Sequence, residues 1–157
     1  MQYGFLFDQT RCMGCNACTV ACKDWNVVNA GPVRWRTHNG HEVLVESAGW
    51  QVFNLVMSCN HCDDPACVKA CPASAISKDE RYGNVTIDRN VCAGYQDCVT
   101  ACPFGAIGIA DNAQESVKKE SWLVDHPAQK CDMCKTRIHE GQKPVCVASC
   151  PARALEW

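Results

Sequence analysis

Several features that mark other protein classes are missing from this sequence of 157 residues. There is no G-x-G-x-x-G dinucleotide loop, no phosphate-binding loop, and no recognisable set of nucleophile, base and orienting group. Long hydrophobic runs are missing too: the longest, around residues 50–57, is interrupted by Gln51 and Asn54 and is far too short to cross a bilayer. We therefore expect no substrate site and no direct membrane insertion.

A signal peptide is not recognisable, because residues 1–7 lack the basic start and the apolar core of one. We therefore expect a cytoplasmic protein, although a partner with a twin-arginine signal could carry the folded chain out. Excess charge is small, since 15 Lys and Arg against 17 Asp and Glu leave a formal net charge of −2. Lys118, Lys119 and Lys130 stand singly or in pairs among acids, which is typical of solvated surface.

Cysteine, by contrast, is abundant, with 15 in the chain. An odd number cannot pair completely, and the close C-x2-C-x2-C spacing suits metal ligands better than loop-closing disulfides. All of them fall into four motifs that vary one pattern, C-x2-C-x2-C-x3-C, which is typical of bacterial iron–sulfur sites. The motifs are Cys12-Cys15-Cys18-Cys22, Cys59-Cys62-Cys67-Cys71, Cys92-Cys98-Cys102 and Cys131-Cys134-Cys146-Cys150. Tyr95 stands where the third motif would be expected to have a second cysteine.

Zinc is the competing metal, because C-x2-C pairs also form structural zinc sites. Zinc sites combine two separated pairs, whereas the first motif packs three cysteines into seven residues and the other three motifs end in C-x3-C-P. We therefore predict iron–sulfur clusters. Each oxidised four-iron cluster with four thiolates carries about −2, so a chain with four clusters is near −10, which argues against a nucleic-acid partner.

The last three motifs share the extension C-P-x-x-A-[I/L], which indicates an internal repeat. The C-x3-C step suits one helical turn, the proline ends it, and the Ala-Ile or Ala-Leu pair begins a strand. The first motif departs from the repeat, because Lys23 follows Cys22. The repeat predicts an α+β fold, one domain over residues 1–157, with short helices and strands around the clusters. We also expect the metal-free chain to be largely unfolded, because the clusters take the place of an apolar core.

The longest connection between motifs, residues 23–58, is predicted to be a β-hairpin insertion laid over the clusters. Within it, Asn39-Gly40 is a strong two-residue turn signal between strands at residues 33–38 and 41–46. A second hairpin is expected around residues 78–84, before a strand at residues 85–87.

Two other segments carry weaker signals. Residues 3–7 are predicted to form a short apolar strand that leads into the first motif. Residues 111–125 are polar and are expected to form a loop with one helical turn.

A family resemblance is carried by the segments Tyr3-Gly4-Phe5, Arg11-Cys12, Cys59 to Pro72, Lys130 to Cys134, and Glu140 to Pro151. These segments closely resemble the iron–sulfur subunits of the dimethyl sulfoxide reductase family, and the resemblance covers nearly the whole chain. It implies two fused ferredoxin-like modules of the bacterial two-cluster type. One module would pair the motifs at residues 12–22 and 131–150, and the other would pair those at residues 59–71 and 92–102. Spacing alone leaves three ways of pairing four motifs.

The same resemblance implies four ligand sets, named sets 1 to 4 here. They are Cys12, Cys15, Cys18 and Cys150 (set 1); Cys22, Cys131, Cys134 and Cys146 (set 2); Cys59, Cys62, Cys67 and Cys102 (set 3); and Cys71, Cys92 and Cys98 (set 4). Tyr95 or Asp97 would lie near the open position of set 4.

Three thiolates can hold a [3Fe-4S] cluster, or a [4Fe-4S] cluster whose fourth iron takes oxygen from water, Tyr95 or Asp97. Related subunits with an aromatic residue at this place favour the three-iron form. We therefore expect three [4Fe-4S] clusters and one [3Fe-4S] cluster, with a three-cysteine [4Fe-4S] cluster as the alternative. A further interpretation is that Tyr95 simply packs over a four-iron cluster.

Clusters without a substrate site predict an electron-transfer subunit that is not catalytic alone. The resemblance implies a large catalytic partner with a molybdenum or tungsten pterin cofactor, and a flavin-containing or other redox subunit as acceptor. Trp157 closely follows the last motif, as in the small subunits of tungsten-dependent enzymes, so a tungsten aldehyde oxidoreductase is the specific expectation. Formate dehydrogenase, hydrogenase and aromatic-ring reductase complexes are alternatives.

Other functions stay open at this point. The protein is alternatively a free polyferredoxin, or a colourless zinc-stabilised interaction module. Copies that stack end to end through the hairpin would extend the row of clusters. His61, inside the second motif, is expected to pack, and Trp35 is either a packing residue or a partner contact.

Overall fold

The elements of this fold are short and are separated by long ligand loops. The computed structural model describes all residues 1–157. In chain order the elements are β1 (Leu6–Phe7), α1 (Ala17–Trp25), β2 (Arg36–Val45), β3 (Gly49–Ser58), α2 (Ala66–Lys69), β4 (Ile76–Lys78), β5 (Val85–Ile87), α3 (Asp97–Ala101), α4 (Lys135–His139), α5 (Val145–Ala148) and β6 (Leu155–Glu156). None of the helices has the length and apolar character that a membrane span requires.

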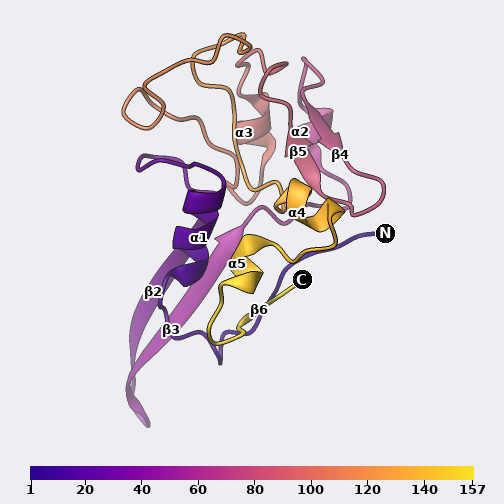
Figure 1. The fold of residues 1–157 in the computed structure, drawn as a ribbon. Coiled ribbons are helices and arrows are strands. Elements are labelled where there is room, and N and C mark those ends of the chain that lie inside the picture. Colours follow the sequence, from indigo (N-terminus) through magenta and orange to yellow (C-terminus); the bar gives the residue numbers. More distant parts are fainter.

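The elements gather in two groups (Figure 1). In the first, α1 packs against α5, and β1 pairs antiparallel with β6, so that both ends of the chain meet there. In the second, α2 packs against α3 beside the antiparallel pair β4 and β5. The elements of the first and fourth motifs thus form one group, and those of the second and third motifs form the other.

Each C-x3-C step is helical, as predicted. The helices α2, α3 and α5 have only four or five residues, and a proline follows the last cysteine of each motif. Helix α1 has nine residues and continues to Trp25, because Lys23 does not interrupt it. The sequence did not predict α4.

The predicted strand is present after two of the three C-P-x-x-A repeats: β4 follows Ala75, and β6 follows Ala154. In the remaining repeat, which ends at Ile107, the backbone forms only a single β-bridge, between Gly108 and Gln129. The hairpin of β4 and β5 agrees with the prediction, while β1 is shorter than predicted. In the polar loop the Asp111 carbonyl accepts N–H bonds from Gln114 and Glu115, which makes the single helical turn expected.

The large hairpin is present, but the predicted turn at Asn39-Gly40 is wrong. Both residues lie inside β2, opposite Leu55 and Asn54, and the register runs unbroken from Arg36 opposite Ser58 to Val45 opposite Gly49. The turn is the three-residue loop 46–48, closed by Gly49 with φ 71°. Ten paired residues in each strand outweigh a local two-residue preference. The far end of the hairpin projects from the body (Figure 1).

Alanine at the two hairpin glycines is expected to change stability in opposite directions. Gly49→Ala forces a side chain into the left-handed region and should cost roughly 1 kcal/mol. Gly40→Ala adds a methyl group in a strand, with Asn54 Oδ1 at an ordinary 3.8 Å, and should gain about 0.5 kcal/mol. Thermal unfolding midpoints of the two iron-loaded variants test this, and a lower midpoint for Gly40→Ala than for Gly49→Ala would restore the first turn assignment.

The apolar core is small, with 33 of 157 residues buried. Its two larger clusters of buried side chains are not purely hydrocarbon, because they include the thiols of Cys92 and Cys98 in one and of Cys18 and Cys146 in the other. The interior of the protein is therefore built around cysteine side chains.

Candidate metal centres

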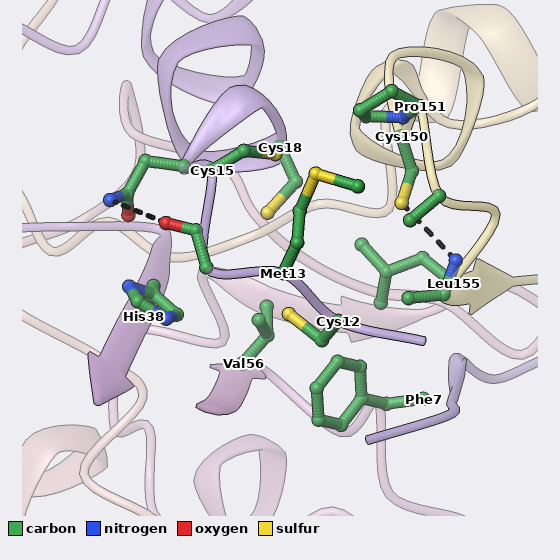
Figure 2. Close-up of a pocket in the computed structure, with 14 residues that line it drawn as sticks. Phe7, Cys12, Met13, Cys15, Cys18, His38, Val56, Cys150, Pro151 and Leu155 are labelled. Carbon is green, nitrogen blue, oxygen red and sulfur yellow. Dashed lines mark hydrogen bonds between the residues drawn. The ribbon is translucent and has the colours of Figure 1, made fainter. Parts of the chain in front are cut away.

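The first cavity lies between the N-terminal ligand loop and the C-terminal motif (Figure 2). All four cysteines of set 1 line it. In Figure 2, the side chains of Cys12, Cys18 and Cys150 approach it from separate segments. Apolar side chains complete the wall, including Phe7, Val56 and Leu155. Thiols from the two ends of the chain therefore face one largely apolar space.

Two further cavities lie in the other group of elements. One is lined by the cysteines of set 3, Cys59, Cys62, Cys67 and Cys102. The other is lined by Cys71, Cys92 and Cys98 of set 4, with Tyr95 and Asp97. In both, thiols of the second and third motifs face the same space.

Set 2 is the most deeply buried, because Cys22, Cys131, Cys134 and Cys146 are all buried. Burial raises the pKa of the Cys22 thiol to about 12, and repulsion from Cys146 and Cys134 adds to that shift. Burial also raises the pKa of Cys131 well above its ordinary value, with repulsion from Cys22 as the next cause. Thiols of the first and fourth motifs therefore face one another here as well.

Shared helices join the sets in pairs. On α1, Cys18 of set 1 lies one turn before Cys22 of set 2, and Cys146 of set 2 lies on α5 just before Cys150 of set 1. Sets 3 and 4 are joined in the same way by α3, which contains Cys98 and is followed directly by Cys102.

Lys130 lies between the two pairs of sets. Its positive charge lowers the pKa of both Cys131 in set 2 and Cys67 in set 3, against the larger opposing effect of burial. The charge of Lys130 therefore acts on thiols of both pairs.

The first and third ligand loops follow the same backbone path. Left-handed φ angles occur at Gly14 (71°), Asn16 (59°), Gly94 (79°) and Gln96 (64°). Few residues other than glycine adopt this conformation, so its repetition at both matched positions shows equivalent loops. Tyr95 lies between Gly94 and Gln96 as Cys15 lies between Gly14 and Asn16, and both side chains are exposed. Tyr95 therefore occupies the place of a second cysteine.

Backbone N–H groups point at several of the thiols. In each C-P-x-x-A repeat the alanine N–H donates to the Sγ atom four residues earlier: Ala75 to Cys71 (3.3 Å), Ala106 to Cys102 (3.4 Å) and Ala154 to Cys150 (3.2 Å). The residue before each alanine has a positive φ, at Ser74, Gly105 and Arg153, which turns the chain back towards the sulfur. Hydrogen bonds to sulfur stabilise thiolate charge and are one of the features that set cluster potentials.

The donor sets fit clusters better than single ions. No three His, Cys, Asp or Glu side chains come close enough together to bind one metal ion. Around a zinc ion with Zn–S bonds of about 2.3 Å, four thiolates would lie roughly 4 Å apart. The cysteines that line each cavity are spaced more widely than a single ion allows. Cysteine thiolates spread in this way fit multi-iron clusters.

Two aromatic side chains from the ligand motifs and the hairpin have packing roles. His61 is fully buried, and its Nδ1 accepts the Val85 N–H at 2.9 Å. Burial, and next the charge of Lys130, lower the pKa of His61 to about 3, so the ring is neutral. Trp35 is half-buried and donates its Nε1–H to Gln129 Oε1 at 3.0 Å, which favours packing over a partner contact.

The prediction that Lys130 lies on the solvated surface is wrong, because this residue is only 3% exposed. Its Nζ donates to the carbonyls of Val85 and Cys131, which hold it in the interior. Arg36, also 3% exposed, is a second buried cation that the sequence did not single out. The available signal for Lys130 was its position directly before a ligand cysteine; Arg36 had none.

Comparisons with known proteins agree with this geometry. A family model described as a 4Fe-4S dicluster domain matches residues 50–157, and a second of the same description matches residues 11–76. The protein is 42% identical over 164 residues to the probable anaerobic dimethyl sulfoxide reductase chain YnfG of Escherichia coli (strain K12), a match that covers 99% of this protein and 73% of that one.

Two other relatives are similar over the same extent. Identity is 38% over 162 residues to a second anaerobic dimethyl sulfoxide reductase subunit of Escherichia coli (strain K12), covering 99% of this protein and 73% of that one. It is also 38% over 157 residues to the thiosulfate reductase electron transfer subunit PhsB of Salmonella typhi, covering 99% and 75%.

Proposed function

Because this chain belongs to the family of 4Fe-4S dicluster proteins that includes the iron–sulfur subunits of dimethyl sulfoxide reductases, we propose that it relays single electrons through four clusters. The electrons would pass between a molybdenum- or tungsten-pterin catalytic subunit and a further redox partner. The protein is an electron-transfer subunit and is not catalytic alone. The observation that carries the proposal is the row of cysteine sets, each made of thiols from two motifs.

In this proposal the ligands are sets 1 to 4, arranged as two ferredoxin-like halves. Clusters held by cysteine thiolates accept and donate single electrons. The protein holds the thiols at fixed positions through α1, α3 and α5, which each serve two neighbouring sets. The Ala75, Ala106 and Ala154 N–H groups stabilise thiolate charge in sets 4, 3 and 1. Apolar side chains make up much of the wall around set 1.

For the partner, the names of the relatives point to reductases of dimethyl sulfoxide and thiosulfate. None of these three names supports the expected tungsten aldehyde oxidoreductase, so the proposal is limited to a molybdenum or tungsten pterin subunit. The test is anaerobic purification of the complex from its native host through a tag on this chain. A large chain at one-to-one stoichiometry, with one molybdenum or tungsten, is the expected result. A monomer with iron and neither heavy metal would instead identify a free polyferredoxin.

For set 4 we propose a [3Fe-4S] cluster, because Tyr95 occupies the place that Cys15 fills in set 1. Tyr95→Cys is expected to remove the EPR signal of the oxidised three-iron cluster and to add about one iron per chain. Tyr95→Phe is the matched control and should keep both the signal and the iron content, since no oxygen ligand is used. Loss of iron in Tyr95→Phe or in Asp97→Asn would instead point to a four-iron cluster with an oxygen ligand.

A further inference from the structure

Apart from the cysteines and Tyr82, the ionisable side chains in the interior are all basic. Arg36 and Lys130 are each 3% exposed and His61 is 0% exposed, while no Asp or Glu is buried. Arginine and lysine side chains are cationic at neutral pH, so Arg36 and Lys130 bring two positive charges into the interior. A buried charge is costly unless an opposite charge accompanies it. Neither Arg36 nor Lys130 takes part in an ion pair with a carboxylate.

Lys130 is held at the junction of sets 2 and 3. Its Nζ donates to the Val85 carbonyl of β5 and, at 2.9 Å, to the Cys131 carbonyl in the loop of set 2. Neutral carbonyls fix its position but leave its charge uncompensated. Val85 lines the cavity of set 3 and Cys131 is a proposed ligand of set 2, so the charge lies next to both sets.

Arg36 lies at the junction of sets 1 and 2, at the start of β2. It donates to Ser58 Oγ at 3.2 Å, and its guanidinium lies 4.6 Å from the centre of the Phe5 ring. Neither neighbour carries a charge. Phe5 packs against the cluster of buried side chains that contains Cys18 of set 1 and Cys146 of set 2, so the guanidinium lies next to both sets.

We propose that Arg36 and Lys130 are the counter-ions of the buried clusters and that they raise the reduction potentials at sets 1, 2 and 3. The inference rests on the proposed function, because the negative charge that pairs them comes from thiolate-bound iron. Reduction adds one negative charge next to each cation, and in a poorly solvated interior this attraction is only weakly screened. Set 2 lies next to both cations and all four of its cysteines are buried, so its potential is raised most. The residues that line the cavity of set 4 include neither cation nor any of their hydrogen-bond partners, so set 4 serves as an internal reference.

Paired variants of the iron-loaded protein in its complex test this. Lys130→Gln and Arg36→Gln keep a hydrogen-bond donor and remove the charge, whereas Lys130→Arg and Arg36→Lys keep the charge. Lys119→Gln, at an exposed lysine, is the control. Potentials are read from EPR-monitored redox titrations, with signals assigned through the cysteine variants described in the Discussion.

We expect each Gln variant to lower the equilibrium constant for reduction at set 2 at least tenfold, which for one electron is about 59 mV. Lys130→Gln should also lower the potential at set 3, and Arg36→Gln at set 1, while set 4, the charge-keeping variants and Lys119→Gln stay unchanged. Unchanged potentials in iron-loaded Gln variants would overturn the inference. A Gln variant could fail to bind iron at all. In that case, normal iron content in the charge-keeping variant at the same position supports the inference, whereas loss of iron in both variants overturns it. Failure of the proposed function is distinct, since the unsubstituted protein would then contain no iron.

Discussion

Removal of iron from this protein with a chelator is expected to abolish its cooperative unfolding transition. Only 33 of 157 residues are buried, most helices have four or five residues, and the cysteine-lined cavities lie where an apolar core would be. Structural metal sites in small folds contribute about 10–16 kcal/mol, which matches or exceeds the 5–15 kcal/mol stability of a whole domain. Loss of the clusters therefore removes more free energy than the remaining contacts can replace.

Circular dichroism during heating, before and after anaerobic chelation, measures this effect. The expected curve after chelation is a gradual slope without a midpoint, and rebuilding the clusters with iron and sulfide should restore the transition. The hairpin of β2 and β3 provides an internal comparison, because its backbone bonds need no metal. A chelated protein that still unfolds with a sharp midpoint would show that the apolar contacts suffice.

Cys22→Ser is expected to remove the cluster of set 2, about four irons per chain, and to leave the cluster of set 1 in place. Cys22 belongs to the first motif by sequence, but its thiol is buried against Cys146 and Cys134. Because the proposed relay passes through set 2 between sets 1 and 3, electron transfer through the protein should stop as well. Iron analysis, EPR spectra and the rate of electron transfer from partner to acceptor measure the three effects.

Cys18→Ser is the matched control, because Cys18 lies one turn earlier on the same helix and lines the cavity of set 1. Its spectrum should match that of Cys150→Ser, and the spectrum of Cys22→Ser should match that of Cys146→Ser. If Cys18→Ser and Cys22→Ser removed the same cluster, the proposed pairing of the first and fourth motifs would be incorrect.

Repeated local patterns in the sequence were sufficient to predict much of the site. The spacing of the cysteines identified all the thiols that line the cavities, because a cluster requires ligands at short, regular intervals. The C-x3-C helices also followed from spacing, since one helical turn is a local structure. Tyr95 stood out for the same reason, because only its motif lacks a fourth cysteine.

Features that depend on distant contacts were not predicted. The turn of the large hairpin is set by the pairing of β2 with β3 rather than by Asn39-Gly40, and pairing register is a property of both strands. Lys130 was placed on the surface because its neighbours in sequence are polar, whereas the carbonyl of Val85, which helps to hold it inside, is 45 residues away. A buried cation that compensates the charge of a cluster cannot be recognised from the sequence until the position of that cluster is known.

The most direct test of the central claim is the metal content of the complex isolated anaerobically from its native host, with iron, acid-labile sulfide, zinc, molybdenum and tungsten measured together. An electron relay of three [4Fe-4S] clusters and one further cluster predicts about 15 to 16 irons per chain, with stoichiometric molybdenum or tungsten. About four zinc ions per chain and no iron would contradict the account.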